Sequence, residues 1–336
     1  MKPSSAGESQ HIINLWVLLV SAAAAWLAPL QTFLIAYAVI GPFHYLTEIA
    51  WLRKKDFYFS DGVISSRVYV FISFVLCGVA CLDFYFRRGW GTYAIVALIV
   101  LSLGALVKNV PVLLGAFALL VATRFLVHGY GLFFAAFVPT VVHVYVFTLI
   151  FLVAGAMRTQ GQRALAWLNP ALLLLIPVLL IRPGSSAGPA MPGHYWMASE
   201  VTFAGLHEYI AGWIGLAMHF DPNHALEPNA VAALRFLAFI YLHHYLNWFA
   251  KTEVLAWHKV SRSSWIVIGA IYTAAIGSYA YSFALGFYAA YFLSLLHVLL
   301  ELPLDWRSVA GILNRPWQTW QARMQAGGSN ASSAEV

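Results

Sequence analysis

The stretch VAALRFLAFIYLHHYLNWFAKTE, residues 231–253, decides how the chain is expected to fold. It begins as an apolar run of the kind that crosses a bilayer as a helix, and then adds two histidines, an asparagine, a lysine and a glutamate. A polar side chain at membrane depth costs several kcal/mol unless it is paired. The stretch therefore predicts a membrane helix that carries part of a buried polar site.

The whole chain has the composition of an integral membrane protein. Of its 336 residues, 61% are hydrophobic and only 10% are charged, and the mean hydropathy is +0.75. Because a helix needs about 20 apolar residues to cross the hydrocarbon, the sequence predicts an all-α, polytopic helix bundle with about eight or nine transmembrane helices. The predicted spans are residues 13–40, 68–86, 92–107, 110–127, 131–157, 170–182, 231–257, 264–282 and 285–304.

These spans are expected to form a single transmembrane domain, residues 1–304, followed by a C-terminal cytoplasmic tail, residues 305–336. Residues 183–230 interrupt the pattern with a turn-rich extramembrane connection that contains an amphipathic helix. Two interpretations of this connection are open, a lid over an opening and a plain link. His207 and Glu208 lie in it, where they would contact a substrate or belong to an exposed face.

The distribution of charge predicts how the chain sits in a membrane. Most Lys and Arg residues fall in segments that share one side if the N-terminus is outside and the C-terminus is cytoplasmic, as in a multi-pass protein of the cell inner membrane. The net charge of +6 then reflects this excess and contact with the lipid bilayer, and it does not indicate nucleic acid. Cys77 and Cys81, one turn apart, are interpreted as small apolar fillers.

Two of the predicted spans carry the same polar pattern, His-x-x-x-Glu. GPFHYLTEIAWL contains His44 and Glu48, and SLLHVLLELPLDW contains His297 and Glu301. The spacing places both side chains of a pair on one helical face. A carboxylate in that position binds a metal ion beside the histidine or holds the second ring N–H of the histidine. The repeated pattern therefore indicates metal chemistry.

Further histidines lie on other spans at similar predicted depth. The four spans concerned are expected to run in the same direction, so their imidazoles should converge inside the bundle, although a hydrogen bond to a neighbouring helix is the competing interpretation for any single one. The predicted metal ligands are His44, His143, His243 and His297. The predicted supporting residues or alternative ligands are Glu48, His244, Asn247 and Glu301.

The choice between the adjacent His243 and His244 rests on helical geometry. Neighbouring residues on a helix point about 100° apart, whereas residues four apart share a face. His243 shares its stripe with Asn247 and Lys251, and His244 shares its stripe with Trp248. Because polar groups are best buried together, we predict that His243 is the ligand.

At these residues the sequence resembles the bacterial Brp/Blh-type carotenoid dioxygenases, membrane enzymes that cleave β-carotene at its central double bond to make retinal. The family has an early Pro-His followed one turn later by Asp, which PFHYLTE resembles through Pro42, His44 and Glu48, although the acid here is Glu and Phe43 separates the proline from the histidine. It also has a histidine in the middle region, which His143 resembles.

The second half of the chain continues this resemblance. HHYLN is similar to the family's helix with two histidines one turn apart, through His243 or His244, with Asn247 at the second position. The last helix is similar through His297 and Glu301. The resemblance implies that the histidines bind non-haem Fe²⁺ and that the substrate is a carotenoid.

The leading functional hypothesis is therefore an iron-dependent dioxygenase that uses O₂ on a lipophilic small-molecule substrate, with a polyene as the best candidate. An alternative is a di-iron fatty-acyl hydroxylase or desaturase that uses His44 with Glu48 and His297 with Glu301 as two metal arms. A further alternative is a transporter or proton-relay protein, in which buried His and Glu side chains exchange protons.

Overall fold

The computed structural model describes residues 5–56, 64–86, 88–127, 129–159, 163–182, 203, 205–216 and 228–332. Within these ranges the chain is helical and forms no strand. Seven helices are long and apolar enough to cross a membrane, and two shorter apolar helices, Trp90–Ala105 and Val110–Phe125, accompany them. The structure therefore confirms the prediction of an all-α membrane-type bundle. The seven are Ser9–Leu27, Pro29–Lys55, Ser66–Asp83, Tyr130–Arg158, Arg163–Leu180, Arg262–Tyr281 and Phe283–Asn314.

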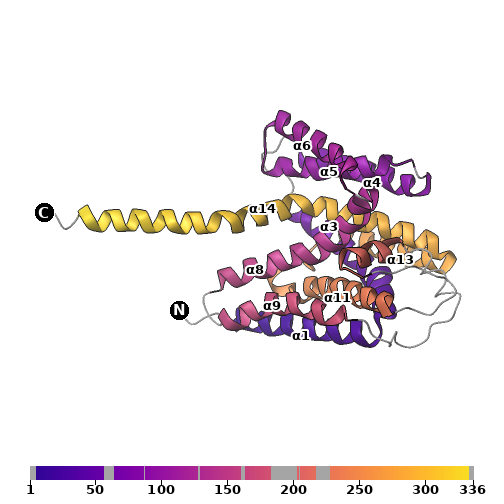
Figure 1. Ribbon diagram of the computed structural model, residues 1–336, viewed down its shortest axis with the longest axis horizontal. Helices are drawn as coiled ribbons and strands as arrows, with labels where there is room; N and C mark the ends of the chain where they lie inside the picture. The colour runs from indigo at the N-terminus through magenta and orange to yellow at the C-terminus, as the bar shows by residue number, and fades with distance from the viewer. Residues whose placement is uncertain are drawn as a thin grey trace.

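Figure 1 shows the helices in their arrangement, with α4, α5 and α6 grouped at the top and α1, α9 and α11 lying together below. In chain order the elements are α1 Ser5–Leu27, α2 Pro29–Ile35, η1 Ala36–Ile40, α3 Gly41–Lys55, α4 Ser66–Phe86, α5 Trp90–Ser102, η2 Leu103–Ala105, α6 Val110–Ala122, η3 Thr123–Phe125, α7 Tyr130–Leu132, η4 Phe133–Phe147, α8 Thr148–Arg158, α9 Arg163–Leu180, α11 Pro228–Ala250, α12 Thr252–Leu255, α13 Arg262–Tyr281 and α14 Phe283–Ser332.

The first predicted span, residues 13–40, is wrong, because the structure divides it between two helices. α1 ends at Leu27, and Ala28 leaves the helical conformation with φ −146° and ψ 66°. Pro29 explains the break: the residue before a proline is disfavoured in a helix, whereas proline itself suits the first helical position. His44 therefore lies within a second long helix that runs from Pro29 to Lys55.

Two of the helices that carry predicted site residues contain wider, π-helical turns. η1 comes directly before α3, which has Pro42 near its start, and the longer η4 has Pro139 inside it. A proline removes a helical N–H, and a π segment is one way in which a helix accommodates such a gap. Such segments are uncommon and often accompany functional sites. Their position beside His44 and at His143 therefore supports a functional role for these two histidines.

Helix α11 lies inside the bundle and is buried almost all the way round. Every residue from Ala230 to His243 is buried, as expected of a helix that is largely apolar on all sides. α11 packs against α1 and α2, and α14 packs against α3, α4 and α13. The predicted span 231–257 ends earlier than expected, because α11 stops at Ala250 and Lys251 forms a turn before α12.

The outer face of the bundle is apolar. Large side chains such as Phe71, Leu119 and Ile266 are mostly exposed, and many others like them cover neighbouring helices. A water-soluble protein rarely exposes apolar surface on this scale, because contact with water costs free energy in proportion to the apolar area. The surface therefore agrees with contact with lipid.

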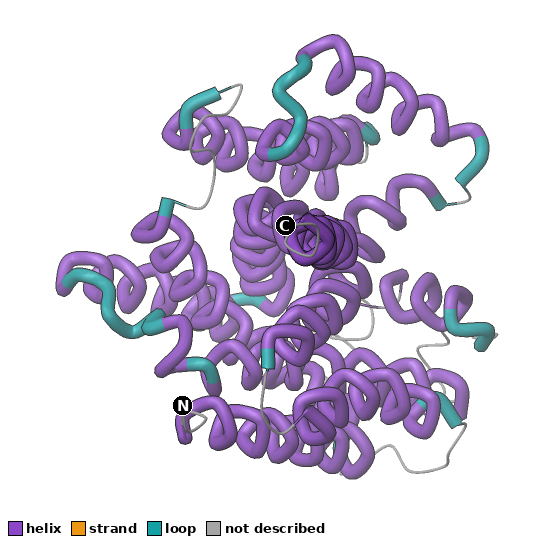
Figure 2. Tube along the Cα trace, turned by 90° about the vertical axis from the view of Figure 1, so that its left-hand side faces the viewer, coloured by secondary structure: helices purple, strands orange, loops and turns teal. Residues whose placement is uncertain are grey.

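The start of α1 and the far end of α14 lie at the same end of the molecule, as Figures 1 and 2 show from two directions. The division of the first predicted span into two helices replaces one predicted span with two candidate spans, Ser9–Leu27 and Pro29–Lys55. The predicted topology, with the N-terminus outside and the C-terminus in the cytoplasm, stays a prediction, because the helices qualify as membrane spans by length and composition alone.

The boundary predicted at residues 304 and 305 is also not visible in the structure. α14 continues without interruption from Phe283 to Ser332, and its last part extends away from the bundle in Figure 1. Of the predicted connection 183–230, residues 183–202, 204 and 217–227 lie outside the described ranges. Residues 205–213 are helical, with Ile210 and Ala211 buried and Trp213 exposed, which agrees with an amphipathic helix.

Candidate metal centre

Four histidines from four different segments meet inside the bundle. They are His44 of α3, His143 of η4, His244 of α11 and His297 of α14. Their ring centroids form a closed circuit, with 4.9 Å from His44 to His244, 5.1 Å from His244 to His143, 5.1 Å from His143 to His297 and 5.4 Å from His297 to His44. The predicted convergence of His44, His143 and His297 is therefore present in the structure.

The spacing of the rings matches that of imidazoles bound to one ion. With metal–nitrogen distances of about 2.0–2.1 Å, neighbouring ring centroids lie about 4.5–5.2 Å apart in planar or tetrahedral arrangements. The positions of the ligand atoms, however, place the four histidines in two separate groups. His44, His244 and His297 offer ligand atoms within 4.8 Å of one another, whereas His143 groups with Glu301 and Asp305 by the same measure.

His243, the predicted ligand, does not join this cluster. Its ring stacks on Phe239 at 5.8 Å and an interplanar angle of 20°, and the adjacent His244 takes the place expected for it. The predicted ligand was therefore wrong by one residue, which corresponds to a rotation of about 100° around the axis of α11. Asn247 is buried, and its Oδ1 atom has no hydrogen-bond partner among the described residues.

Thr148 orients His244. Its Oγ1 atom lies 2.8 Å from Nδ1 of the imidazole, whereas Nε2 has no hydrogen-bond partner among the described residues. A hydrogen bond to one ring nitrogen fixes the tautomer and turns the other nitrogen toward a ligand position. Thr148 begins α8, directly after η4, and no motif or spacing in the sequence distinguishes it from other threonines.

The carboxyl groups lie against the imidazoles. Glu48 Oε2 is 3.1 Å from Nε2 of His44, so the pair indicated by the His-x-x-x-Glu spacing is in contact. Glu301, in contrast, leaves the histidine of its own helix and places Oε2 3.5 Å from Nε2 of His143. The carboxyl groups of Glu48 and Glu301 also interact with each other, which joins the two halves of the cluster.

Asp305 belongs to the same cluster, although it was assigned to the C-terminal tail. It is completely buried, and its Oδ2 atom lies 3.9 Å from Nδ1 of His143. His297, Glu301 and Asp305 follow one another at intervals of one turn on α14. That spacing was a signal in the sequence, but the drop in hydropathy after residue 304 obscured it.

The cluster holds three carboxyl groups, one ammonium group and several buried atoms without a hydrogen-bond partner in the described part of the chain. Three carboxyl groups interact electrostatically with one another, and Lys251 is the ammonium group that acts on Glu48 and Glu301. Nδ1 of His44 and Nε2 of His244 have no hydrogen-bond partner among the described residues. Because each buried unsatisfied polar atom costs about 1–3 kcal/mol, the arrangement fits a bound cation.

The ligand atoms of the cluster, imidazole nitrogens and carboxylate oxygens, suit several transition-metal ions. Imidazole nitrogens suit iron, zinc and copper, and carboxylates beside them are common in iron sites with open positions. The residues fit such an ion in two groups, His44, His244 and His297 in one and His143, Glu301 and Asp305 in the other. The cluster therefore has ligands for one ion and a possible second position next to it.

An aromatic pocket of about 400 Å³ lies near the imidazoles, bordered by η4, α11 and α14. Two tyrosines lie against the histidines. Tyr45 and Tyr245 share a hydrogen bond of 2.5 Å, and Tyr45 stacks on His297 at 4.2 Å. Ser294 lines the pocket and hydrogen-bonds Tyr45, so the pocket reaches the layer that touches the imidazoles.

The segment before α11 forms part of this pocket. Phe203, Gly205 and Leu206 line it, so at these positions the predicted connection serves as a wall. His207 is 1% exposed and packs against Phe33 and Phe203, so the exposed-face interpretation is wrong for this residue.

Comparison with known proteins gives no family assignment. No protein-family model matches the sequence, and no curated protein and no solved structure matches it either. The resemblance to the Brp/Blh-type enzymes therefore rests on the quoted motifs, and the functional argument rests on the geometry of the site.

Proposed function

We propose that the chain is a membrane-embedded non-haem iron oxygenase that acts on an apolar, membrane-dissolved substrate, with a carotenoid or similar polyene as the substrate class. The observation that carries the proposal is the convergence of His44, His244 and His297 beside an aromatic pocket. When bound, ferrous iron with an open coordination position supplies O₂ binding and oxidation chemistry.

The surrounding side chains have separable tasks under this proposal. His44, His244 and His297 hold the ion, Glu48 orients His44, and Thr148 orients His244. Such outer partners fix ring orientation and raise the basicity of the ligands. Tyr45 and Tyr245 exclude water from the pocket side of the imidazoles, because their rings lie directly against His297 and His44.

The pocket supports an apolar substrate that enters from the membrane. Tyr37, Phe287 and Tyr291 are among the aromatic residues that line it, and flat rings pack well against a long conjugated chain. Leu132, which is 40% exposed, also lines the pocket, so the pocket extends to the apolar outer surface of the bundle.

The test of this proposal is expression in a host that accumulates carotenoids, followed by extraction of the pigments. The proposal predicts loss of the coloured polyene and formation of shorter, oxygen-containing products, and both should disappear in a His44→Ala variant. Unchanged pigments beside an iron-loaded protein would contradict the substrate class, and a protein without metal would favour the proton-relay alternative.

Thr148→Val is expected to weaken iron retention about 10-fold, because valine has nearly the same shape but cannot hydrogen-bond Nδ1 of His244. The measurement is the iron that remains after dialysis against a graded series of chelator. Thr140→Val is the matched control, since Thr140 lies on η4 and hydrogen-bonds Tyr241 instead. Equal loss of iron in both variants would show that Thr148 has no specific role.

Ala136→Trp is expected to abolish product formation while the iron content stays unchanged, because Ala136 lines the pocket and a tryptophan there would occupy much of it. Pigment analysis measures product formation, and metal analysis of the same preparation measures the iron content. Ala274→Trp is the control, because Ala274 is exposed on α13 and does not line the pocket. Full activity of Ala136→Trp would place the substrate elsewhere.

A second candidate function is a dinuclear metal hydroxylase or desaturase of acyl chains. One observation favours it, the second ligand group formed by His143, Glu301 and Asp305. These three residues would hold a second ion, and Glu301 interacts with Glu48, which contacts His44 of the first group. Metal analysis separates the candidates, since about one iron per chain supports the first and about two support the second.

A further inference from the structure

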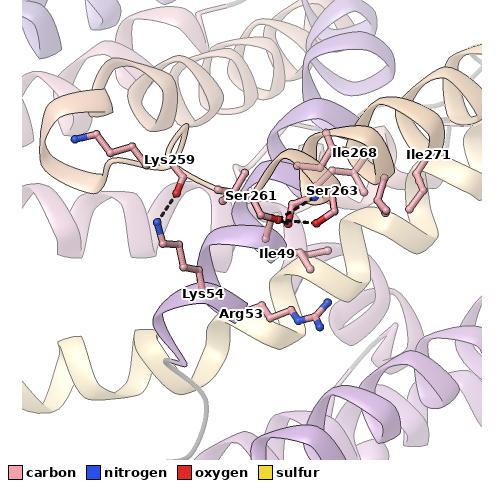
Figure 3. Close-up of a pocket in the computed structure, with 13 residues that line it drawn as sticks. Ile49, Arg53, Lys54, Lys259, Ser261, Ser263, Ile268 and Ile271 are labelled. Atoms are coloured by element: carbon pink, nitrogen blue, oxygen red, sulfur yellow. Dashed lines mark hydrogen bonds between the residues drawn. The ribbon is translucent and has the colours of Figure 1, made fainter.

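We propose that the groove between α3 and α13 binds an anionic phospholipid, with the headgroup at its basic end and one acyl chain along its apolar wall. Figure 3 shows this groove, which has a volume of about 810 Å³. The proposal is independent of the metal centre and of the function proposed for it.

The basic end of the groove is built from α3 and from the turn before α13. Arg53, Lys54 and Lys259 line it, and none of the residues that line the groove is acidic. Lys54 donates a hydrogen bond to the backbone carbonyl of Lys259, which ties the end of α3 to this turn, as the dashed line in Figure 3 indicates. Asp56, the carboxylate that follows α3, does not line the groove.

Hydroxyl groups lie next to these cations. Ser261 caps α13 by accepting a hydrogen bond of 3.1 Å from the backbone N–H of Ser264. The Oγ atom of Ser261 is also 2.9 Å from that of Ser263 and 2.8 Å from that of Ser264. Hydroxyls and ammonium groups together are the donors that bind phosphate oxygens.

The rest of the groove is apolar and lies along the helices. Leu46, Ile49, Val267, Ile268 and Ile271 line it, and Val267 and Ile271 are 55% and 40% exposed. A ligand that fills the whole groove must therefore carry an anionic group at one end and an apolar chain beyond it. A free phosphate leaves the apolar wall uncovered, and a zwitterionic lipid gains less from Arg53 and Lys54, so an anionic phospholipid fits best.

The groove and the metal centre lie on opposite faces of α3. Leu46 and Ala50 line the groove, and each lies two residues beyond a residue of the metal cluster, His44 and Glu48. Two residues along a helix correspond to a rotation of about 200°. A lipid in the groove is therefore separated from the imidazoles by the helix itself, and it is not placed to be the oxidised substrate.

The first arm of the test removes the charge. Phosphatidylglycerol binding to the full chain in detergent is measured by native mass spectrometry. The combined variant Arg53→Gln, Lys54→Gln and Lys259→Gln is expected to bind about 10- to 100-fold more weakly than the wild type. The control variant, Lys108→Gln with Arg158→Gln and Arg163→Gln, removes the same charge from exposed positions elsewhere and should bind normally. Equal weakening in both would overturn the proposal.

The second arm fills the groove without a change of charge. Ile271→Trp is expected to reduce phosphatidylglycerol binding about 10-fold, whereas Ile266→Trp, on an exposed residue that does not line the groove, should leave it unchanged. Phosphatidylcholine with the same chains should bind more weakly, and glycerol 3-phosphate should not compete. Equal binding of phosphatidylcholine, or effective competition by glycerol 3-phosphate, would contradict an anionic lipid, and iron content should be unchanged in all of these variants.

Discussion

Replacing His244 with alanine is expected to lower the iron content of the purified protein to below about one tenth of the wild-type value, because it removes one of three converging ligands. His243→Ala is expected to keep most of the iron, since His243 stacks on Phe239 and does not join the ligand group. Metal analysis of the two variants, purified in parallel without chelator, checks the difference.

The two substitutions control for each other. Both remove an imidazole from α11, and both side chains are largely enclosed by neighbouring helices, so each should lower stability to a similar extent. Thermal unfolding followed by circular dichroism would confirm that the helices remain. If His243→Ala lost the metal and His244→Ala retained it, the orientation of α11 described here would be wrong.

Glu301→Gln is expected to weaken iron retention about 10- to 100-fold. The change keeps the size of the side chain but replaces the carboxyl group, whose Oε2 atom lies 3.5 Å from Nε2 of His143, with an amide that cannot become an anionic ligand. Chelator titration of the loaded protein measures the change. If the centre holds two ions, the same variant should drop from about two ions per chain to about one.

Asp56→Asn is the matched control for this variant. Asp56 is exposed at the end of α3 and has a left-handed backbone with φ 49°, which asparagine adopts easily. The substitution therefore removes a carboxylate outside the cluster without backbone strain, and iron retention should not change. A Glu301→Gln protein that retains iron as well as Asp56→Asn would show that Glu301 is only a structural residue.

Local patterns in the sequence predicted the parts of the site that one helix determines. The contact between His44 and Glu48 follows from residues four apart on a helix, which share a face whatever surrounds them. The same spacing did not predict the contacts of Glu301. A side chain on the expected face of a helix can still contact residues on any of several neighbouring helices. The imidazole nearest to Glu301 is that of His143, from another segment of the chain.

The rotation of α11 about its axis could not be predicted from its pattern. A helix with one apolar face reveals which side points inward, but α11 is buried on nearly all sides. His243 and His244 therefore both find protein neighbours, Phe239 for the first and Thr148 for the second. The stripe that favoured His243 also included Lys251, which lies beyond the end of the helix.

Composition predicted that the chain crosses a membrane, but it misplaced two boundaries. The apolar run through residues 13–40 concealed the break at Pro29, so one span was predicted where the structure has two helices. At the other end, the loss of hydropathy suggested a tail after residue 304, although α14 continues and buries Asp305. Both errors arise because hydropathy measures contact with lipid and does not record helix breaks or polar groups enclosed by protein.

Whether the histidine cluster binds iron can be measured by anomalous X-ray scattering at the iron absorption edge, from crystals of protein loaded with ferrous iron. An anomalous peak is expected among the rings of His44, His244 and His297, about 2.0–2.2 Å from their nitrogen atoms. A second peak beside His143 would support the dinuclear candidate. Loaded crystals with no peak among these rings would show that the cluster does not bind iron.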